Sequence, residues 1–203
     1  MSSKIETLNG HFVDPLNMDP ADVRIEDIAH ALSMQCRFSG YVSRPYSVAE
    51  HSVYVARLTA MTLAQRWGFQ HWRDVLANPK HKTTVRQALL HDATEAYLVD
   101  LPSPLKRHFP EFRAAEHKLW AVLAGVFNVP EDMHALVKEV DGRICTTEKL
   151  ALLGPAMTEE EWGAFFRTFP PYEGVWDIID RYEVGWRQAR RRFIDFYELV
   201  REG

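Results

Sequence analysis

Four polar residues stand where a helical repeat predicts buried side chains, and all four are of types that bind metal ions. His51 lies three residues after Val48, on one face of a predicted helix, and so needs a partner inside the fold. His91 and Asp92 interrupt a second such face, and Asp141 interrupts a third. A buried carboxylate is costly unless it is paired, hydrogen-bonded or bound to a metal. Together these residues predict one site for a divalent ion.

The donor set indicates which ions and which reactions the site would suit. Two imidazoles with two carboxylates favour a transition ion such as Mn, Co, Fe, Ni or Zn over Ca, with Mg also compatible. Such a set leaves coordination positions for water and substrate. A phosphate ester repels an attacking hydroxide, so its hydrolysis needs a cation, an acidified water and basic side chains. The alternative is that each residue is an ordinary buried or capping polar group and that the His-Asp dipeptide is coincidental.

The helices that would carry these residues begin and end at recognisable signals. Residues 47 to 50, Ser-Val-Ala-Glu, have the form of a capping box, in which a hydroxyl and a carboxylate satisfy backbone donors at a helix start. His51 then falls in the first turn of that helix. Apolar steps of three and four residues, with prolines as breaks, predict the remaining helices. They cover Asp22 to about Gly40, about Thr84 to Tyr97, about Glu111 to Phe127, Pro130 to beyond Ile144, and a last helix from Val175 to Val200 that includes Ile178, Tyr182 and Trp186.

The pattern as a whole predicts an all-α fold, a helical bundle in a single domain. No stretch alternates with a period of two residues, so no sheet is expected. The expected organisation is a turn-rich lead-in at 1–21 and a domain at 22–203, with the metal-site core at about 22–150 and further helices at 151–203. The Trp-, Pro- and Gly-rich stretches at 67–83 and 154–173 are expected to be connectors, and 67–83 could lengthen or close a pocket.

Composition and charge exclude several classes of protein. Of the 203 residues, 46% are apolar and 26% are charged, which is enough for a sizeable core in one domain. The net charge of -4 argues against a general nucleic-acid coat and against a binder of anionic membranes. Cys36 and Cys145 have no CxxC spacing, and the longest apolar run has nine residues, below the about 20 that span a bilayer. Without the apolar core of a signal peptide, a cytoplasmic protein is expected.

The order of the four candidate ligands resembles a known family. A lone His, an adjacent His-Asp pair on a second helix and a distant Asp on a later helix are the signature of the HD-domain metal-dependent phosphohydrolases. The stretch HDATEAYLVDLPSPLK, from His91 to Lys106, is similar to the subgroup of bacterial 5'-deoxynucleotidases and phage dATP triphosphohydrolases. The pair Arg37-Phe38, ahead of the capping box, resembles the same subgroup. The resemblance covers about residues 22–150 and implies the HD-domain helical fold.

The resemblance also implies a role for ten residues. The metal ligands would be His51, His91, Asp92 and Asp141, the catalytic acids Glu95 and Asp100, and the substrate-binding residues Arg37, Phe38, Lys106 and Lys138. In this assignment the two acids act on the attacking water and the basic residues hold phosphate. Phe38 stands where relatives often place a Trp against the sugar. Because Phe has no indole donor, strict selectivity for 2'-deoxy sugars does not follow.

Two reactions on nucleotides fit the resemblance, and a non-enzymatic role stays open beside them. A nucleotidase removes the 5'-phosphate from a dNMP, whereas a triphosphohydrolase releases nucleoside and inorganic polyphosphate from a dNTP. Both use the same metal ligands, so the sequence does not separate them. The alternative is a non-catalytic HD-fold module that binds a metal or ligand as a scaffold, although such a module is expected to have lost ligands. The expected partners are a small-molecule nucleotide and, by the resemblance, further copies of the chain in a dimer or larger ring, with no stable nucleic acid and no membrane.

Overall fold

A capping box begins the longest helix in the described part of the chain, as the sequence predicts. The computed structural model describes residues 4–153, 162–174, 179 and 183–202. Helix α2 (Val48–Trp67) begins where the Ser47 hydroxyl accepts the Glu50 amide and the Glu50 carboxylate accepts the Ser47 amide. It ends at Gly68, whose φ of 71° is a left-handed conformation that glycine adopts without a Cβ penalty.

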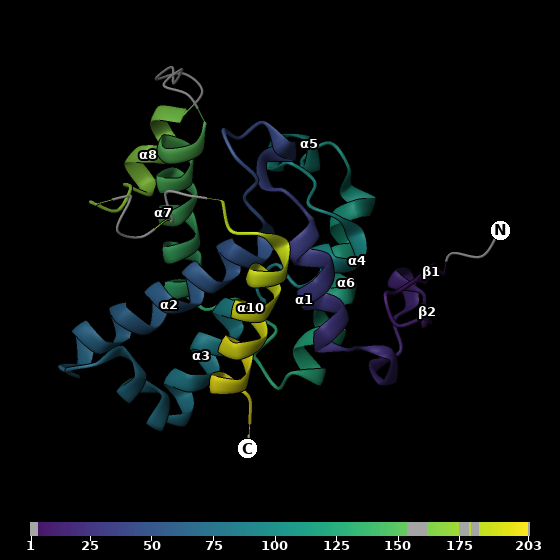
Figure 1. The fold of residues 1–203 in the computed structure, drawn as a ribbon, viewed down its shortest axis with the longest axis horizontal. Coiled ribbons are helices and arrows are strands. Elements are labelled where there is room, and N and C mark those ends of the chain that lie inside the picture. Colours follow the sequence, from purple (N-terminus) through teal and green to yellow (C-terminus); the bar gives the residue numbers. More distant parts are fainter. Residues whose placement is uncertain (1–3, 154–161, 175–178, 180–182, 203) are drawn as a thin grey trace.

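Most of the other long helices pack against α2 (Figure 1). α2 contacts α1, α3, α7 and α10, while α1 also packs along α10 and against the short α4. The α-helices are α1 (Ile25–Met34), α3 (Pro79–Leu90), α4 (Glu95–Leu98), α5 (Ser103–Lys106), α6 (Pro110–Val126), α7 (Ala135–Leu152), α8 (Ala164–Thr168) and α10 (Trp186–Val200). Short 3-10 helices are η1 (Pro15–Asn17), η2 (Pro20–Asp22), η3 (Arg37–Gly40) and η4 (Trp72–Ala77). The all-α prediction is confirmed.

The expectation of no sheet is wrong in one place, near the amino-terminus. Strand β1 (Ile5–Glu6) pairs antiparallel with β2 (Phe12–Val13) in a small hairpin at one edge of the molecule (Figure 1). Strands of two residues are too short to show a period-two pattern, which explains the miss. Val13 is fully buried, and Lys118 of α6 donates to the Leu16 carbonyl at 2.6 Å. The lead-in is therefore anchored to the helices, and its boundary at residue 22 stays a prediction.

The first helix is shorter than the apolar spacing suggests. α1 ends at Met34, although the spacing predicts six further helical residues. Cys36 instead forms an antiparallel bridge with Ser47, and the Arg37 amide donates to the Tyr46 carbonyl at 2.9 Å. This pairing draws the chain away from the axis of α1 and leads into η3. It places Arg37 beside the start of α2.

A single glutamine explains why α7 begins later than expected. α7 begins at Ala135, five residues after the predicted start at Pro130. The Gln87 side chain of α3 donates to the carbonyls of Pro130 and Asp132 and accepts the His134 amide. The segment before α7 is thereby tied to α3 through its own backbone groups and does not coil into a helix.

The predicted connector at 67–83 is partly helical. α3 begins at Pro79, earlier than expected, because the Asn78 side chain caps two amides of the first turn and proline is well suited to that position. η4 packs against α2 and α3, and Trp72 stacks on Phe196 of α10 with ring centroids 5.7 Å apart. The connector is therefore part of the helical body.

The last helix is shorter than predicted, and one stripe of its side chains is buried. α10 begins at Trp186, and residues 183–185 before it are not helical. The predicted helical positions Val175, Ile178 and Tyr182 lie outside the described residues, as does the 154–161 part of the predicted connector. The buried side chains of α10 are Ala189, Phe193, Phe196 and Val200. In the described ranges, no helix combines the length and the apolar character needed to cross a bilayer.

Candidate metal centre

Two histidine rings meet between α2 and the end of α3. His51 Nε2 lies 3.2 Å from His91 Nε2. The other nitrogen of each ring is already engaged, because His51 Nδ1 donates to Glu148 at 2.7 Å and His91 Nδ1 donates to the Ala88 carbonyl at 2.8 Å. A neutral imidazole with its proton on Nδ1 presents a lone pair at Nε2. In that neutral form both lone pairs face one space, as in histidines that bind a metal.

Two carboxylate oxygens lie at the same space. Asp92 Oδ2 is 3.3 Å from His91 Nε2 and 3.5 Å from His51 Nε2, and Asp141 Oδ1 is 3.7 Å and 3.2 Å from the same two atoms. Ligand atoms about 2.1 Å from one ion are separated by about 3.0 Å in octahedral and about 3.4 Å in tetrahedral geometry. The ligand atoms of His51, His91 and Asp92 all lie within 4.8 Å of one another. Asp141 approaches them through the two imidazoles, but 41% of its side chain is exposed, so it is not buried as predicted. We call these four residues the metal cluster, because their donors and spacing fit one divalent ion.

The His-Asp pair reaches the cluster because the chain tightens after α3. The predicted helix through Tyr97 is wrong, since residues 91–94 form turns and α4 begins only at Glu95. Hydrogen bonds spanning three residues rather than four are made by the amides of Ala93, Glu95, Ala96 and Tyr97. With three residues per turn, side chains three apart eclipse, so Asp92 and Glu95 share a face.

The charged groups of the metal cluster shift one another's pKa values. Burial alone would lower the pKa of His51 and His91, but the surrounding carboxylates outweigh it and raise the pKa of both, that of His91 well above 6.5. Burial alone would raise the pKa of Asp92 and Asp141, but the histidines hold the pKa of Asp92 at about 2 and that of Asp141 well below its usual range. The pocket thus favours positive charge between two carboxylates, which a divalent cation would supply.

Glu148 is the site residue that the sequence prediction missed. Its side chain, on α7, is fully buried and accepts three hydrogen bonds, from His51 Nδ1 at 2.7 Å, the Tyr46 hydroxyl at 2.8 Å and Arg37 Nε at 3.1 Å. Burial would raise its pKa, but Arg37 and His51 lower it below the usual value, so the carboxylate is ionised. The signal was present, because Glu148 lies four residues after Ile144 on the predicted buried stripe.

Arg37 and Phe38 border the metal cluster on the η3 loop. Arg37 is bound to Glu148, its Nη1 lies 3.4 Å from Asp92 Oδ2, and 12% of its side chain is exposed. The Phe38 ring lies 5.5 Å from the guanidinium. Phe38 and Ser39 have φ values of 55° and 52°, left-handed conformations that are uncommon outside glycine. Strained backbone of this kind concentrates at functional sites, so the loop is a candidate substrate contact.

Glu95 and Asp100 are carboxyl groups that resist ionisation beside the metal cluster. Burial and the nearby Asp92 raise the pKa of Glu95 well above its usual value, and burial also raises the pKa of Asp100. The Gln35 side chain joins their backbones by donating to the Glu95 carbonyl at 2.9 Å and accepting the Asp100 amide at 3.0 Å. Glu95 Oε2 is buried without a hydrogen-bond partner among the described residues. That oxygen is available to a water molecule or a substrate.

The two candidate lysines lie at different distances from the chemistry. Lys106 Nζ donates to Glu116 of α6 at 2.7 Å, so its ammonium group is already paired. Its charge still lowers the pKa of Glu95 and of Asp100. Lys138 is exposed on α7, and in the described part of the chain no side-chain hydrogen bond or ion pair joins it to the metal cluster. The structure therefore brings Lys106 to the edge of the site and leaves Lys138 outside its contacts.

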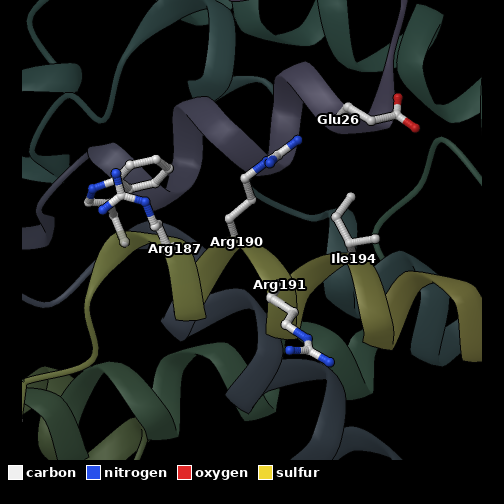
Figure 2. Close-up of a pocket in the computed structure, with 6 residues that line it drawn as sticks. Glu26, Arg187, Arg190, Arg191 and Ile194 are labelled. Atoms are coloured by element: carbon white, nitrogen blue, oxygen red, sulfur yellow. The ribbon is translucent and has the colours of Figure 1, made fainter.

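A concave surface lies between α1 and α10 (Figure 2). It has a volume of about 410 Å³ and is lined by Glu26, Trp186, Arg187, Arg190, Arg191 and Ile194. The guanidinium groups of Arg187, Arg190 and Arg191 point in different directions (Figure 2). Arg191 also pairs with Asp195 at 3.6 Å. Diverging cations do not converge on one phosphate, so the metal cluster remains the better candidate site.

One family model and two relatives match the chain. A family model described as 5'-deoxynucleotidase YfbR-like matches residues 32–141, a range that contains the whole metal cluster. The Escherichia coli (strain K12) protein named as uncharacterized protein YfdR is 38% identical over 149 residues, which are 72% of this chain and 71% of that protein. A Rhodobacter capsulatus protein, also named as uncharacterized, is 32% identical over 137 residues, 64% of this chain and 61% of its own length. The family match ends at Asp141, seven residues before Glu148.

Proposed function

The chain belongs to the YfbR-like family of 5'-deoxynucleotidases in the HD-domain superfamily, and from this premise we propose that it hydrolyses the 5'-phosphate bond of small nucleotides. The family match confirms the resemblance that the sequence shows. The observation that carries the proposal is the metal cluster, in which four donors from three parts of the chain surround one space. Glu95 beside it adds a group suited to proton transfer. A solvated or merely structural set of polar residues would not converge in this way.

The metal cluster would hold one divalent transition ion. His51 and His91 present Nε2 lone pairs, and Asp92 and Asp141 are ionised oxygens at matching distances. A mixed set of imidazole and carboxylate ligands suits Mn, Co, Fe, Ni or Zn, and Mg is the weaker alternative. When bound, the ion would supply a Lewis acid that lowers the pKa of a water molecule and polarises a phosphoryl oxygen.

Glu95 and Asp100 would handle the proton of the attacking water. A positioned carboxyl group can take a proton from water and return it to the leaving oxygen, and burial and the nearby Asp92 raise the pKa of Glu95 well above its usual value. The free Oε2 of Glu95 is the atom for this transfer. Asp100, joined to Glu95 through Gln35, would orient the same water.

Arg37 and Phe38 would hold the nucleotide. The exposed part of the Arg37 guanidinium would donate to phosphate oxygens, and Lys106 would add positive charge from the edge of the site. Phe38 would offer an aromatic face to the sugar, and without an indole donor it gives no reason to expect strict 2'-deoxy selectivity. Lys138 would meet only a substrate that reaches beyond these residues, such as a triphosphate.

Product analysis tests the proposal directly. Metal-free protein would be loaded with Mn, Co or Mg, its metal content measured, and then incubated with deoxy- and ribonucleoside mono- and triphosphates. We expect inorganic phosphate and nucleoside from dNMPs, resolved by chromatography. Polyphosphate and nucleoside from a dNTP would instead identify a triphosphohydrolase. Stoichiometric metal without turnover of any of these substrates would contradict the nucleotidase proposal and favour a metal-binding scaffold.

A further inference from the structure

We propose that Glu148 is a positioning residue that fixes a metal ligand and the substrate cation together, by directing His51 toward the metal cluster and restricting Arg37 to a long contact with Asp92. The inference rests on the proposed function, because Glu148 has no reaction of its own. It concerns a residue outside the family match, which ends at Asp141. The carboxylate reaches both groups because α7 brings it to the buried side of the cluster.

The first half of this role is the orientation of His51. Glu148 Oε1 accepts the His51 Nδ1 proton at 2.7 Å and the Tyr46 hydroxyl at 2.8 Å. Both His51 and Glu148 are fully buried, so water cannot replace the bond. The bond places the proton on Nδ1 and directs the Nε2 lone pair at the cluster. Loss of such a carboxylate behind a ligand imidazole costs about 10 to 100-fold in metal affinity.

The second half is the restraint of Arg37. Glu148 Oε2 accepts Arg37 Nε at 3.1 Å, while Arg37 Nη1 makes a longer, one-point ion pair with Asp92 Oδ2 at 3.4 Å. A guanidinium and a carboxylate that have no other partner form a bidentate ion pair with two parallel hydrogen bonds. Without Glu148, Arg37 would close on Asp92 and compete with the ion for a ligand oxygen. With it, Asp92 stays available to the metal and the outer edge of the guanidinium to phosphate.

Thermal stability alone does not distinguish this role from a structural ion pair. Removing one partner of a buried pair destabilises a protein whatever the pair does. Metal affinity, phosphate affinity and the position of the His51 proton respond only if Glu148 positions the two groups. Those three quantities are therefore the readouts.

The experiment compares Glu148→Gln and Glu148→Asp with a control on the same helix. The control is Glu139→Gln, whose carboxylate is half-exposed and pairs with Arg66 at the surface. Each metal-free protein is titrated with Mn²⁺ by calorimetry, and inorganic phosphate is then titrated into the metal-loaded form. We expect Glu148→Gln to weaken Mn²⁺ binding by about 10 to 100-fold and to weaken phosphate binding as well. Glu148→Asp keeps the charge but shortens the reach, so its loss should be intermediate, and Glu139→Gln should match the unaltered chain.

Nitrogen NMR of the imidazoles completes the test. In the metal-free unaltered chain at alkaline pH, where the imidazole is neutral, we expect His51 to carry its proton on Nδ1, and in Glu148→Gln this preference should weaken. The proposal would be overturned if both variants only melted at a lower temperature, while their Mn²⁺ affinity and the position of the His51 proton stayed unchanged. If Glu148→Gln does not fold, Glu148→Asp decides by the same criteria. Failure of the unaltered chain to bind Mn²⁺ is a separate result that would overturn the proposed function itself.

Discussion

Arg86 and Glu148 are both charged side chains removed from water, but their partners differ in kind. Arg86 is 2% exposed and donates to the carbonyls of Val200 at 3.0 Å and Asn128 at 2.7 Å, with Glu202 as a further acceptor. Glu148 is completely buried and accepts only from side chains. The Arg86 cluster joins α3 to the ends of α6 and α10. The Glu148 cluster joins α7 to α2 and η3 and ends at the metal site.

The difference teaches what each buried charge stabilises. Carbonyls at helix ends lack partners within their own helix, and the backbone holds them in place. Arg86 satisfies them and so fixes how three helices meet. Side chains can turn, so a charge that binds side chains instead fixes their orientation. We therefore expect changes at Arg86 to alter stability and changes around Glu148 to alter chemistry.

Backbone strain follows the same division. Asn128, beside Arg86, has a φ of 49°, a left-handed conformation that asparagine adopts at small cost. Val99, between the two candidate catalytic acids, has φ 66° and ψ 159°, a region that is essentially reserved for glycine. A β-branched residue there is a true outlier. The strained position thus lies on the site side, directly before Asp100.

The largest expected effect is from His91→Ala, which removes a metal ligand. Turnover should be abolished. Loss of a residue that hydrogen-bonds to a ligand costs up to about 100-fold in metal affinity, and loss of the ligand itself should cost more. Helical content should change little, because His91 lies after the end of α3. Calorimetry and circular dichroism measure the two outcomes. Full turnover at limiting metal would show that the metal cluster is assigned wrongly. The contrast between a structural Arg86 cluster and a chemical Glu148 cluster would then no longer hold.

Glu95→Gln should separate proton transfer from metal binding. The amide keeps the shape of the side chain but cannot take a proton, so kcat should fall by about 10² to 10⁴-fold. Mn²⁺ affinity should stay within a few-fold, because the nearest ligand atoms are unchanged. Steady-state kinetics at saturating Mn²⁺ give the first value and calorimetry the second. A kcat within twofold of the unaltered chain would exclude Glu95 as the proton carrier.

Arg86→Met should act on stability alone. Methionine fills similar space but leaves buried carbonyls without a donor, at about 1 to 3 kcal/mol each, so a total near about 3 kcal/mol is expected. At about 2 to 4 °C for each kcal/mol, the melting temperature should drop by about 6 to 12 °C. The Mn²⁺ dissociation constant of the folded variant should be unchanged. A large loss of metal affinity at a temperature where the variant is folded would erase the contrast with Glu148.

The metal cluster could be predicted because its signal is local to each helix. A histidine or aspartate that interrupts an apolar stripe is visible from residues three or four positions away, and the structure brings the four together. The capping box at Ser47 is equally local. Glu148 also lies on such a stripe, but its partner Arg37 is 111 residues away, so spacing alone does not reveal what the carboxylate binds.

Helix ends were harder to predict because distant partners decide them. The late start of α7 depends on Gln87, which is 47 residues from His134. The early end of α1 depends on the pairing of Cys36 with Ser47 across a loop. The turn at 91–94 keeps apolar spacing that is compatible with a helix, and only its hydrogen bonds show that the chain has tightened.

The two clusters also differ in acidity, because only the metal cluster contains histidines whose pKa is raised. The pKa values of His51 and His91 are raised, since neighbouring carboxylates outweigh burial. In the Arg86 cluster, the hydrogen bond from Asn128 lowers the pKa of Glu202, which stays ionised at neutral pH. Protons and metal compete for the imidazole Nε2 atoms, so Mn²⁺ binding should tighten as pH rises above 6.5, by up to about one decade per pH unit for each proton released.

The same linkage gives the metal-free protein the opposite trend. Its folded state binds these imidazole protons more tightly than the unfolded chain does, so that stabilisation is present below pH 6.5 and is lost as pH rises through the raised pKa values. Calorimetric titrations and thermal melts across neutral pH measure both trends. A Mn²⁺ affinity that does not change with pH would show that the histidines carry no protons for the metal to displace.

Val99→Gly should have the smallest effect, and it should change stability and turnover in opposite directions. Relief of strain, about 1 to 3 kcal/mol, exceeds the about 0.5 to 1 kcal/mol entropic cost of glycine, and the 58% exposed side chain loses little burial. The melting temperature should therefore rise by about 2 to 4 °C. Turnover should fall because the backbone before Asp100 is no longer fixed. The loss should be smaller than the about 10²-fold that a misplacement of about 1 Å costs. The matched change Asn128→Gly, at the left-handed residue beside Arg86, should leave turnover unaltered. Equal effects of the two substitutions on turnover would mean that strain at Val99 has no part in the chemistry. Only strain close to the active site should lower stability and raise activity at the same time.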